Sequence, residues 1–447
     1  MSLSGIIYCC RRWLLLSTCI TISLAAIAGA QSRPDVPGPL QKAEIAEIID
    51  SVLTAYEIHY VYPDTARALS AHIRKSFADG AYDDITDLSE IAQRLNDDMR
   101  SFTHDMHIHI YVMSPDDSPS ISDTLTNDVI ARRARDNFGF RKVELLAGNI
   151  GYLRLDTFHD AVYAGEAAAA AMNFLARCSA LIIDLRYNKG GSETMVRFLA
   201  SYFFKSPTMI NAHYFTETDM LVQSWTSAYV PGRKLVDAEL YILTSNRTSS
   251  GAEAFAYGMK HSDRAVLIGE TTDGSAHMTA SWDFPNLGIR AVIPDARPVN
   301  PVTRTSWERT GVKPHIEVAA DSAFDVAYAN ALRTLLKTEE DERSRATLIW
   351  VLDRMEADRM QYKPDRNDIK QYVGTYGPRR VFSKDGVLYY RRDENDPMIM
   401  IPMERDLFRL EEIDYFRIRF KRNEKGEVIE LTGLYSDGQT EPSPRTE

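Results

Sequence analysis

The sequence has few cysteines, and most of them lie near its start. Four cysteines occur in 447 residues, and Cys9, Cys10 and Cys19 all fall within the first twenty positions. If that N-terminal segment is removed, Cys178 is left alone, so no internal disulfide can form. The fold must then be stabilised by its own hydrophobic core.

The sequence also has no block rich in lysine or arginine, and its formal net charge is −11. A basic patch is what nucleic acids and anionic membrane surfaces attract. We therefore expect no nucleic-acid partner.

Only the N-terminus carries a long apolar run. Arg11 and Arg12 precede a largely apolar stretch, residues 13–27, which gives way to Ala28-Gly29-Ala30. This pattern predicts a secretory signal peptide over 1–30, cleaved after Ala30. The alternative is an uncleaved membrane anchor, but the apolar run of about 15 residues is shorter than the roughly 20 that span a bilayer. We expect an exported protein, periplasmic or extracellular, with no membrane insertion after cleavage.

The rest of the chain shows three successive residue patterns, which predict an α/β protein with accessory domains. Apolar residues recur at helical spacing near the start, strands alternate with helices in the middle, and short alternating strands fill the end. The expected order is a linker (31–40), an N-terminal helical domain (41–112), a connector (113–137), a catalytic core (138–337), a helical linker (338–369) and a C-terminal antiparallel β domain (370–447).

The segment around Ser250 is the first candidate for chemistry. An apolar strand, 240–244, leads through a polar turn into a helix that begins near Ser250. A hydroxyl there would lie at the end of a strand, beside helix N–H groups that can stabilise an oxyanion. The simpler interpretation is a helix cap, with Glu253 completing a capping box. On this segment alone the cap is favoured.

A second signal is the turn Gly190-Gly191 after the apolar strand 180–184. Two glycines let a backbone approach a ligand closely with its N–H groups exposed. The pattern lacks the Gly-Lys-Ser/Thr ending of a Walker loop. A phosphate-binding turn and a tight strand-to-helix connection both remain open.

Histidines cluster at His104, His107 and His109. Alternation with isoleucine predicts a strand with His107 and His109 on one face. These side chains could hold a metal, but no clear third ligand exists beyond His104 or Asp105. We expect no metal and no cofactor, with a metallohydrolase as the minor alternative.

Taken together, five segments resemble a known family, in its order: 150–155, 184–191, 248–253, 268–276 and 307–314. They are similar to tail-specific (C-terminal processing) proteases and tricorn protease, and more narrowly to the branch named for interphotoreceptor retinoid-binding protein. The resemblance implies a ClpP/crotonase-like βαβ core and an exported serine endopeptidase. It covers roughly residues 40–335.

The resemblance also implies catalytic roles. Ser250 matches the nucleophile, and the Gly251 amide with that of Gly190 or Gly191 would form the oxyanion hole. Tail-specific proteases pair their serine with a lysine, but Ser275 stands at that place in this chain.

Without that lysine, the tricorn-like arrangement implies a Ser–His–Glu triad. His107 then matches the general base and Glu308 the group that orients it. Arg309 follows Glu308 where the family commonly has glycine.

The expected substrate is a peptide or an unfolded protein segment. The interval from 113 to 148 is too short for the PDZ domain that holds C-terminal tails in many relatives. The alternative function is a non-catalytic binding protein for a hydrophobic ligand or peptide, and the oligomeric state is left open.

Overall fold

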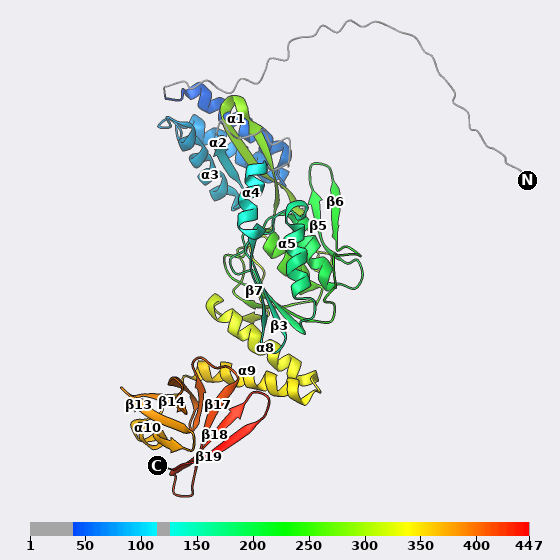
Figure 1. Cartoon of the computed structure of the whole chain (residues 1–447). Helices are drawn as coiled ribbons and strands as arrows, with labels where there is room; N and C mark the ends of the chain where they lie inside the picture. Colours follow the sequence, from blue (N-terminus) through cyan, green and yellow to red (C-terminus); the bar gives the residue numbers. More distant parts are fainter. Residues whose placement is uncertain (1–38, 114–125, 447) are drawn as a thin grey trace, which may run out of the picture.

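The computed structural model describes residues 39–113 and 126–446, and its parts follow one another along an elongated molecule (Figure 1). The N-terminal helices lie at one end, a sheet covered by helices in the middle, and an antiparallel β domain at the other end. The predicted signal peptide lies outside the described residues. Within the described ranges, no helix is both long and apolar enough to cross a membrane.

The N-terminal region contains three amphipathic helices. They are α1 (Lys42–His59), α2 (Pro63–Ala78) and α3 (Leu88–Thr103). Pro63 begins α2, where its fixed φ suits a helix and its missing N–H costs nothing. Asp87 caps α3 by accepting the N–H groups of Ser89 and Glu90.

The central sheet has six strands in the order β11-β8-β7-β4-β3-β2. Their bounds are β2 (Phe140–Leu146), β3 (Ile150–Leu155), β4 (Ala180–Asp184), β7 (Glu239–Thr244), β8 (Val266–Gly269) and β11 (Ile316–Glu317). Only β2 pairs antiparallel to its neighbour, and the other five strands are parallel. The carboxyl ends of β4 and β7 therefore meet at one edge, where the glycine turn and Ser250 follow.

Helices cover both faces of this sheet. On one side lie α5 (Ala161–Phe174), α6 (Glu193–Ala200) and α7 (Gly251–His261), and on the other lies α8 (Ala323–Thr338). In β4, Leu181 and Ile183 pack under the first group, whereas Ile182 packs with α8. Burial on both faces explains why this strand is continuously apolar.

A second, antiparallel sheet joins the N-terminal helices to the core. It has the order β1-β10-β5-β6, with β9 also paired to β10. The strands are β1 (His109–Val112), β5 (Met209–Phe215), β6 (Met220–Trp225), β9 (Met278–Phe284) and β10 (Ile289–Pro298). Ile289, Ala291 and Ile293 of β10 share one hydrophobic cluster with α1, α2 and α3. β10 lies within the predicted catalytic core (138–337), so that part of the chain supplies some of the surface against which the N-terminal helices pack.

Short helices connect these parts. They are α4 (Asn127–Arg135), η1 (Asn137–Gly139), η2 (Ser201–Phe203), η3 (Pro285–Leu287) and η4 (Ala320–Ser322). The range expected to be a helical linker, 338–369, contains α9 (Glu342–Met360), which begins where Asp341 caps it by accepting the N–H of Ser344.

The C-terminal domain is an eight-stranded meander in which each strand pairs with the next. After α10 (Arg366–Tyr372) come β12 (Gly374–Tyr376), β13 (Arg379–Lys384), β14 (Val387–Arg392), β15 (Met398–Glu404), β16 (Leu407–Leu410), β17 (Phe416–Arg422), β18 (Val428–Tyr435) and β19 (Thr440–Pro444). Just after β19, the N–H of Thr446 donates to the carbonyl of Thr375 at 2.9 Å, which nearly closes a barrel. The structure confirms the predicted fold class: an α/β core, a helical N-terminal region and an antiparallel β domain.

Candidate active site

Ser250 occupies a sharp turn between β7 and α7. Its backbone angles, φ 52° and ψ −119°, are rare for a residue with a side chain. Such strain persists only where surrounding contacts enforce it, and it is concentrated at functional sites. A plain helix cap has extended backbone angles, so this conformation favours the catalytic interpretation of Ser250 over the capping one.

Glu253 is the contact that enforces the turn. Its buried carboxylate accepts the N–H groups of Ser250 (2.8 Å), Gly274 (2.7 Å) and Ser275 (2.9 Å) and the hydroxyl of Thr272. Burial raises the pKa of Glu253 to about 7, and the four donors act against that rise. Glu253 thus ties the Ser250 turn to the 272–275 loop.

The glycine turn packs directly against Ser250. A Cβ on Gly190 would lie 2.8 Å from the Ser250 Cβ, and one on Gly191 would lie 2.1 Å from the carbonyl oxygen of Phe158. Both glycines have positive φ, 93° and 130°, so only glycine fits at either position. The Gly190 N–H donates to Asn188 Oδ1 at 2.8 Å, so it already has a hydrogen-bond acceptor within the protein. Of the two candidates, Gly191 is therefore the better oxyanion donor beside Gly251.

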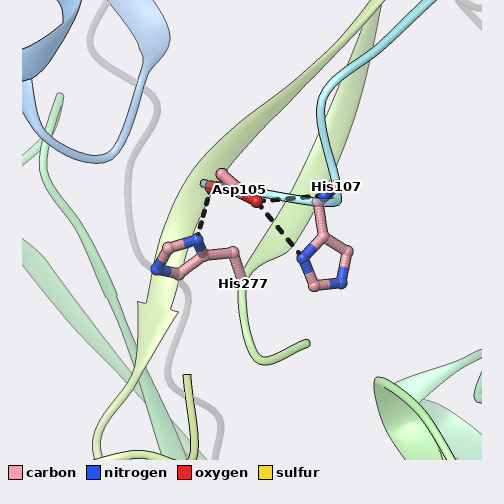
Figure 2. A group of neighbouring side chains, drawn as sticks. All are labelled: Asp105, His107 and His277. Atoms are coloured by element: carbon pink, nitrogen blue, oxygen red, sulfur yellow. Dashed lines mark hydrogen bonds and ion pairs between the residues drawn. The ribbon is translucent and has the colours of Figure 1, made fainter. Parts of the chain in front are cut away.

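Asp105 lies between two histidines (Figure 2). Its Oδ2 is 2.7 Å from His277 Nδ1, and its Oδ1 is 3.6 Å from His107 Nδ1. The first distance is that of a hydrogen bond. The second is too long for a hydrogen bond and is that of an ion pair. His277 comes from the segment just before β9, and Asp105 and His107 from the turn after α3.

Asp105 is fully buried and held by further donors. The N–H of His107 donates to Oδ1 at 3.0 Å, and the Tyr60 hydroxyl donates to Oδ2 at 3.1 Å. Burial alone would raise the pKa of Asp105, but its contacts with His107 and His277 outweigh this and hold the pKa well below its ordinary value. Asp105 is therefore ionised throughout the range in which histidine titrates.

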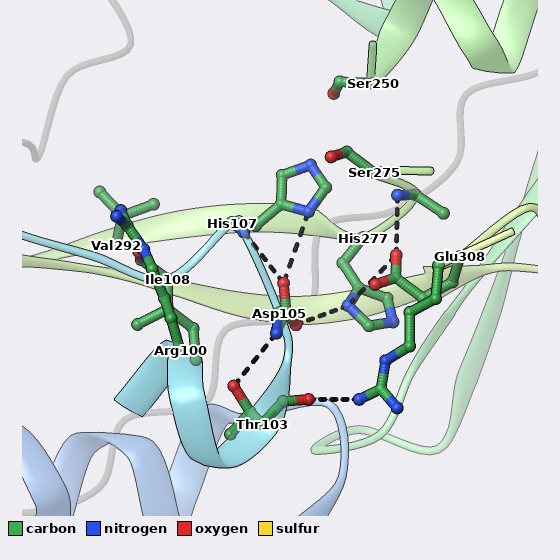
Figure 3. A network of polar contacts seen from close by, with 12 residues as sticks. Arg100, Thr103, Asp105, His107, Ile108, Ser250, Ser275, His277, Val292 and Glu308 are labelled. Atoms are coloured by element: carbon green, nitrogen blue, oxygen red, sulfur yellow. Dashed lines mark hydrogen bonds and ion pairs between the residues drawn. The ribbon is translucent and has the colours of Figure 1, made fainter. Parts of the chain in front are cut away.

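His107 faces the side of the network on which Ser250 lies. In the view of Figure 3, its ring lies between Asp105 and Ser250. Both ring nitrogens are buried and have no hydrogen-bond partner, so His107 does not bond to Ser250 in this structure. Catalytic hydrogen bonds are often absent or long in unliganded enzymes and tighten when substrate binds.

Glu308 contacts the opposite end of the network. Its carboxylate accepts the N–H of Ala276 at 2.8 Å and lies 3.8 Å from His277 Nδ1. Within the described ranges, the carboxylate within 4 Å of the His107 ring is that of Asp105. The structure thus brings Asp105, rather than the predicted Glu308, against His107.

Ser275 stands at the place where tail-specific proteases carry a lysine, and its side chain forms a hydrogen bond within its own loop. Its hydroxyl donates to Asp273 Oδ2 at 2.6 Å. A cavity of about 280 Å³ adjoins this segment, and its lining includes Met106, Glu308 and Arg309. The Arg309 guanidinium donates to the carbonyl of Thr103, next to the Asp105 turn.

The predicted histidine cluster separates in space. His104 ends α3 with a φ of 56°, and His109 begins β1 beside Arg100. Among the described residues, the group able to hold a metal is Asp105, His107 and His277, whose ligand atoms all lie within 4.8 Å of one another. Sequence reasoning missed His277, although it directly follows the 268–276 segment that carries the family resemblance.

Two protein-family models match parts of this chain. Residues 149–318 match Peptidase family S41, and residues 40–135 match the N-terminal domain of Peptidase S41 in eukaryotic IRBP. Together the two matches cover more than half of the chain.

Individual relatives are more distant. A carboxyl-terminal-processing protease of Picosynechococcus is 27% identical over 139 residues, which are 31% of this chain and 32% of that protein. This chain therefore matches about a third of the length of that curated relative.

Two solved structures are similar to part of this chain. The photosystem II D1 C-terminal processing protease has 22% identity and a TM-score of 0.33, over 38% of this chain and 43% of its own. Tricorn protease has 11% identity and a TM-score of 0.46, over 66% of this chain and 37% of its own. The family assignment rests on the two family matches and on the residues that they contain, and not on these structures. The chain belongs to Peptidase family S41.

Proposed function

We propose that this protein is a serine peptidase that hydrolyses peptides or unfolded protein segments, with Ser250 as nucleophile and His107 as general base. The observation that carries the proposal is the strained backbone of Ser250, clamped by Glu253 and packed against the glycine turn. The Glu253 contact also belongs to a capping box, but a helix cap needs neither the positive φ nor the glycine turn.

Asp105 orients the base. Because the Nδ1 edge of His107 faces the Asp105 carboxylate, Nε2 is the nitrogen left to accept the proton of the Ser250 hydroxyl. The ionised Asp105 stabilises the imidazolium that then forms. Glu308, which accepts the Ala276 N–H, positions the segment that carries His277.

The reaction has two steps. Ser250 Oγ bonds to the scissile carbonyl carbon while His107 takes the hydroxyl proton, and the same proton passes to the leaving amine as the peptide bond breaks. Water then gives a proton to His107 as its oxygen bonds to the acyl carbon. The bond from the acyl carbon to Ser250 Oγ breaks, His107 returns the proton to Oγ, and the acid is released. The amides of Gly251 and Gly191 would hold the oxyanion in both steps.

Covalent labelling tests this function. The protein should react with a fluorophosphonate at Ser250 and hydrolyse an unstructured peptide, and Ser250→Ala should abolish both. Ser249→Ala is the matched control, because the neighbouring Ser249 hydroxyl donates to Asp273 and points to a separate contact. Label that persists in Ser250→Ala, or none on folded protein, would reject the peptidase and favour the binding-protein alternative, particularly if a hydrophobic ligand co-purifies.

We also propose that the protein is exported. The proposal rests on the residue pattern of 1–30 and on the single cysteine beyond it. N-terminal sequencing of protein recovered outside the cytoplasm should begin at Gln31. An intact N-terminus on protein retained in the cytoplasm would contradict it.

A further inference from the structure

We infer that Asp105, His107 and His277 form a binding site for Zn²⁺ or a similar divalent transition metal, and that metal bound there inhibits the peptidase. The inhibition rests on the proposed function, whereas the binding does not.

The three side chains already converge on one point. Their ligand atoms lie within 4.8 Å of one another, and Asp105 Oδ2 is only 2.7 Å from His277 Nδ1. Tetrahedral zinc with bonds of about 2.0–2.1 Å needs ligand atoms about 3.3 Å apart. Small rotations of the side chains therefore suffice to form the site.

His107 is the member whose hydrogen bonding is incomplete. Both of its ring nitrogens are buried without a hydrogen-bond partner, and a buried polar group left unsatisfied is destabilising. Peptide substrate would satisfy this ring only during turnover. A metal ion would satisfy it in the resting enzyme.

The set of ligands selects the kind of metal. Two imidazoles and a carboxylate suit zinc and its neighbours, whereas Mg²⁺ and Ca²⁺ prefer oxygen ligands alone. Three protein ligands leave a fourth position open. Water from the adjoining cavity or the Glu308 carboxylate, 3.8 Å from His277 Nδ1, would fill it.

Neighbouring groups hold these ligands in place. The Tyr60 hydroxyl and the backbone N–H of His107 both donate to the Asp105 carboxylate. Metal at His277 Nδ1 requires that the ring proton sit on Nε2, and the Tyr62 hydroxyl oxygen is 3.4 Å from that atom. Such outer contacts fix the tautomer and orientation of metal-binding histidines.

Metal in this site would disable the base. Metal on His107 Nδ1, the nitrogen that faces Asp105, requires that the ring proton sit on Nε2, which then cannot accept the proton of Ser250. The positive charge also opposes formation of the imidazolium. The effect should be reversible, because a chelator restores the free imidazole.

Binding is measured on a protein that cannot turn over. Ser250→Ala protein is titrated with zinc chloride by calorimetry and with Co²⁺ by visible absorption. We expect one ion per chain and the intense bands of four-coordinate cobalt. Adding His277→Gln should weaken zinc binding by at least about 100-fold, more than loss of an outer contact costs.

The control is His104→Asn, which changes a histidine of the same turn outside the three and keeps a residue type that tolerates positive φ. His107→Gln serves as a second ligand variant if His277→Gln does not fold. Absence of one-to-one binding, or binding that survives both ligand variants, would overturn the site. In active protein, zinc should suppress fluorophosphonate labelling and a chelator should restore it, whereas labelling that zinc leaves unchanged or raises would overturn the inhibitory role.

Discussion

Asp105 and Glu308 both lie near the two histidines, but their surroundings differ and favour different roles. Asp105 is fully buried and contacts both histidines, whereas Glu308 accepts a backbone N–H and approaches only His277. An orienting group must contact the base that it orients. Asp105 meets this condition in the structure.

Exchange of the two carboxylates for amides tests the assignment. Asp105→Asn should lower kcat by about 10³-fold or more, because the His107 tautomer and the stabilising charge are lost together. Glu308→Gln keeps an oxygen that can accept the Ala276 N–H, so its loss should be much smaller. Steady-state hydrolysis of one peptide measures both, and the reverse order would restore Glu308 as the orienting residue.

Glu253 shows how one buried side chain can set the backbone geometry of Ser250, the proposed nucleophile. Glu253→Gln replaces an oxygen that accepts N–H donors with an NH₂ group that repels them. We expect a loss of about 1–3 kcal/mol in the free energy of unfolding and slower fluorophosphonate labelling of Ser250. Chemical denaturation and labelling rates measure these effects, and a variant unchanged in both would show that the clamp is dispensable.

At the scale of elements, the second sheet decides where the site forms. β10 pairs with both β1 and β9, and it thereby places the 104–108 turn beside the segment that carries His277. Its residues include Pro294 and Pro298, and a bulge follows Pro294. Proline inside an apolar run argues against a central strand. The sequence analysis did not identify this strand, and its two prolines obscure it.

His213 on β5 predicts a dependence of stability on pH. Burial lowers the pKa of His213 to about 4, below its ordinary 6.5. Between these values the unfolded chain binds more protons, so stability should fall as pH drops below about 6.5, by up to about 3 kcal/mol near pH 4.

His213→Gln should flatten this dependence, as measured by denaturant unfolding at several pH values. His72→Gln, at an exposed histidine, is the control and should leave it unchanged. An unaltered slope in His213→Gln would assign the pH dependence to other groups.

At the scale of the molecule, α9 connects the core to the β domain. The Trp350 indole N–H donates to the carbonyl of Asp414 at 2.7 Å, and the Arg417 guanidinium lies 3.7 Å from the centre of the Trp350 ring. These contacts lie at the opposite end of the core from the N-terminal helices (Figure 1).

Trp350→Ala should therefore loosen the β domain without altering the active site. Loss of the stacking and the hydrogen bond should cost about 2 kcal/mol and separate a second thermal transition from the main one. Ile349→Ala, at an exposed position on the same helix, is the control. Labelling of Ser250 should keep its rate in both variants, and a changed rate would show that the β domain acts on the site.

The sequence by itself determined the α/β class from its local residue patterns. Five motifs that resemble the family, in its order, then pointed to Ser250, His107 and the glycine turn. Only the tertiary structure decided which carboxylate meets His107 and that His277 joins it. Asp105 and His277 are 172 positions apart, and their contact depends on strand pairing through β10 that no local pattern reveals. The backbone strain at Ser250 was equally hidden, because the contacts that enforce it come from three separate segments.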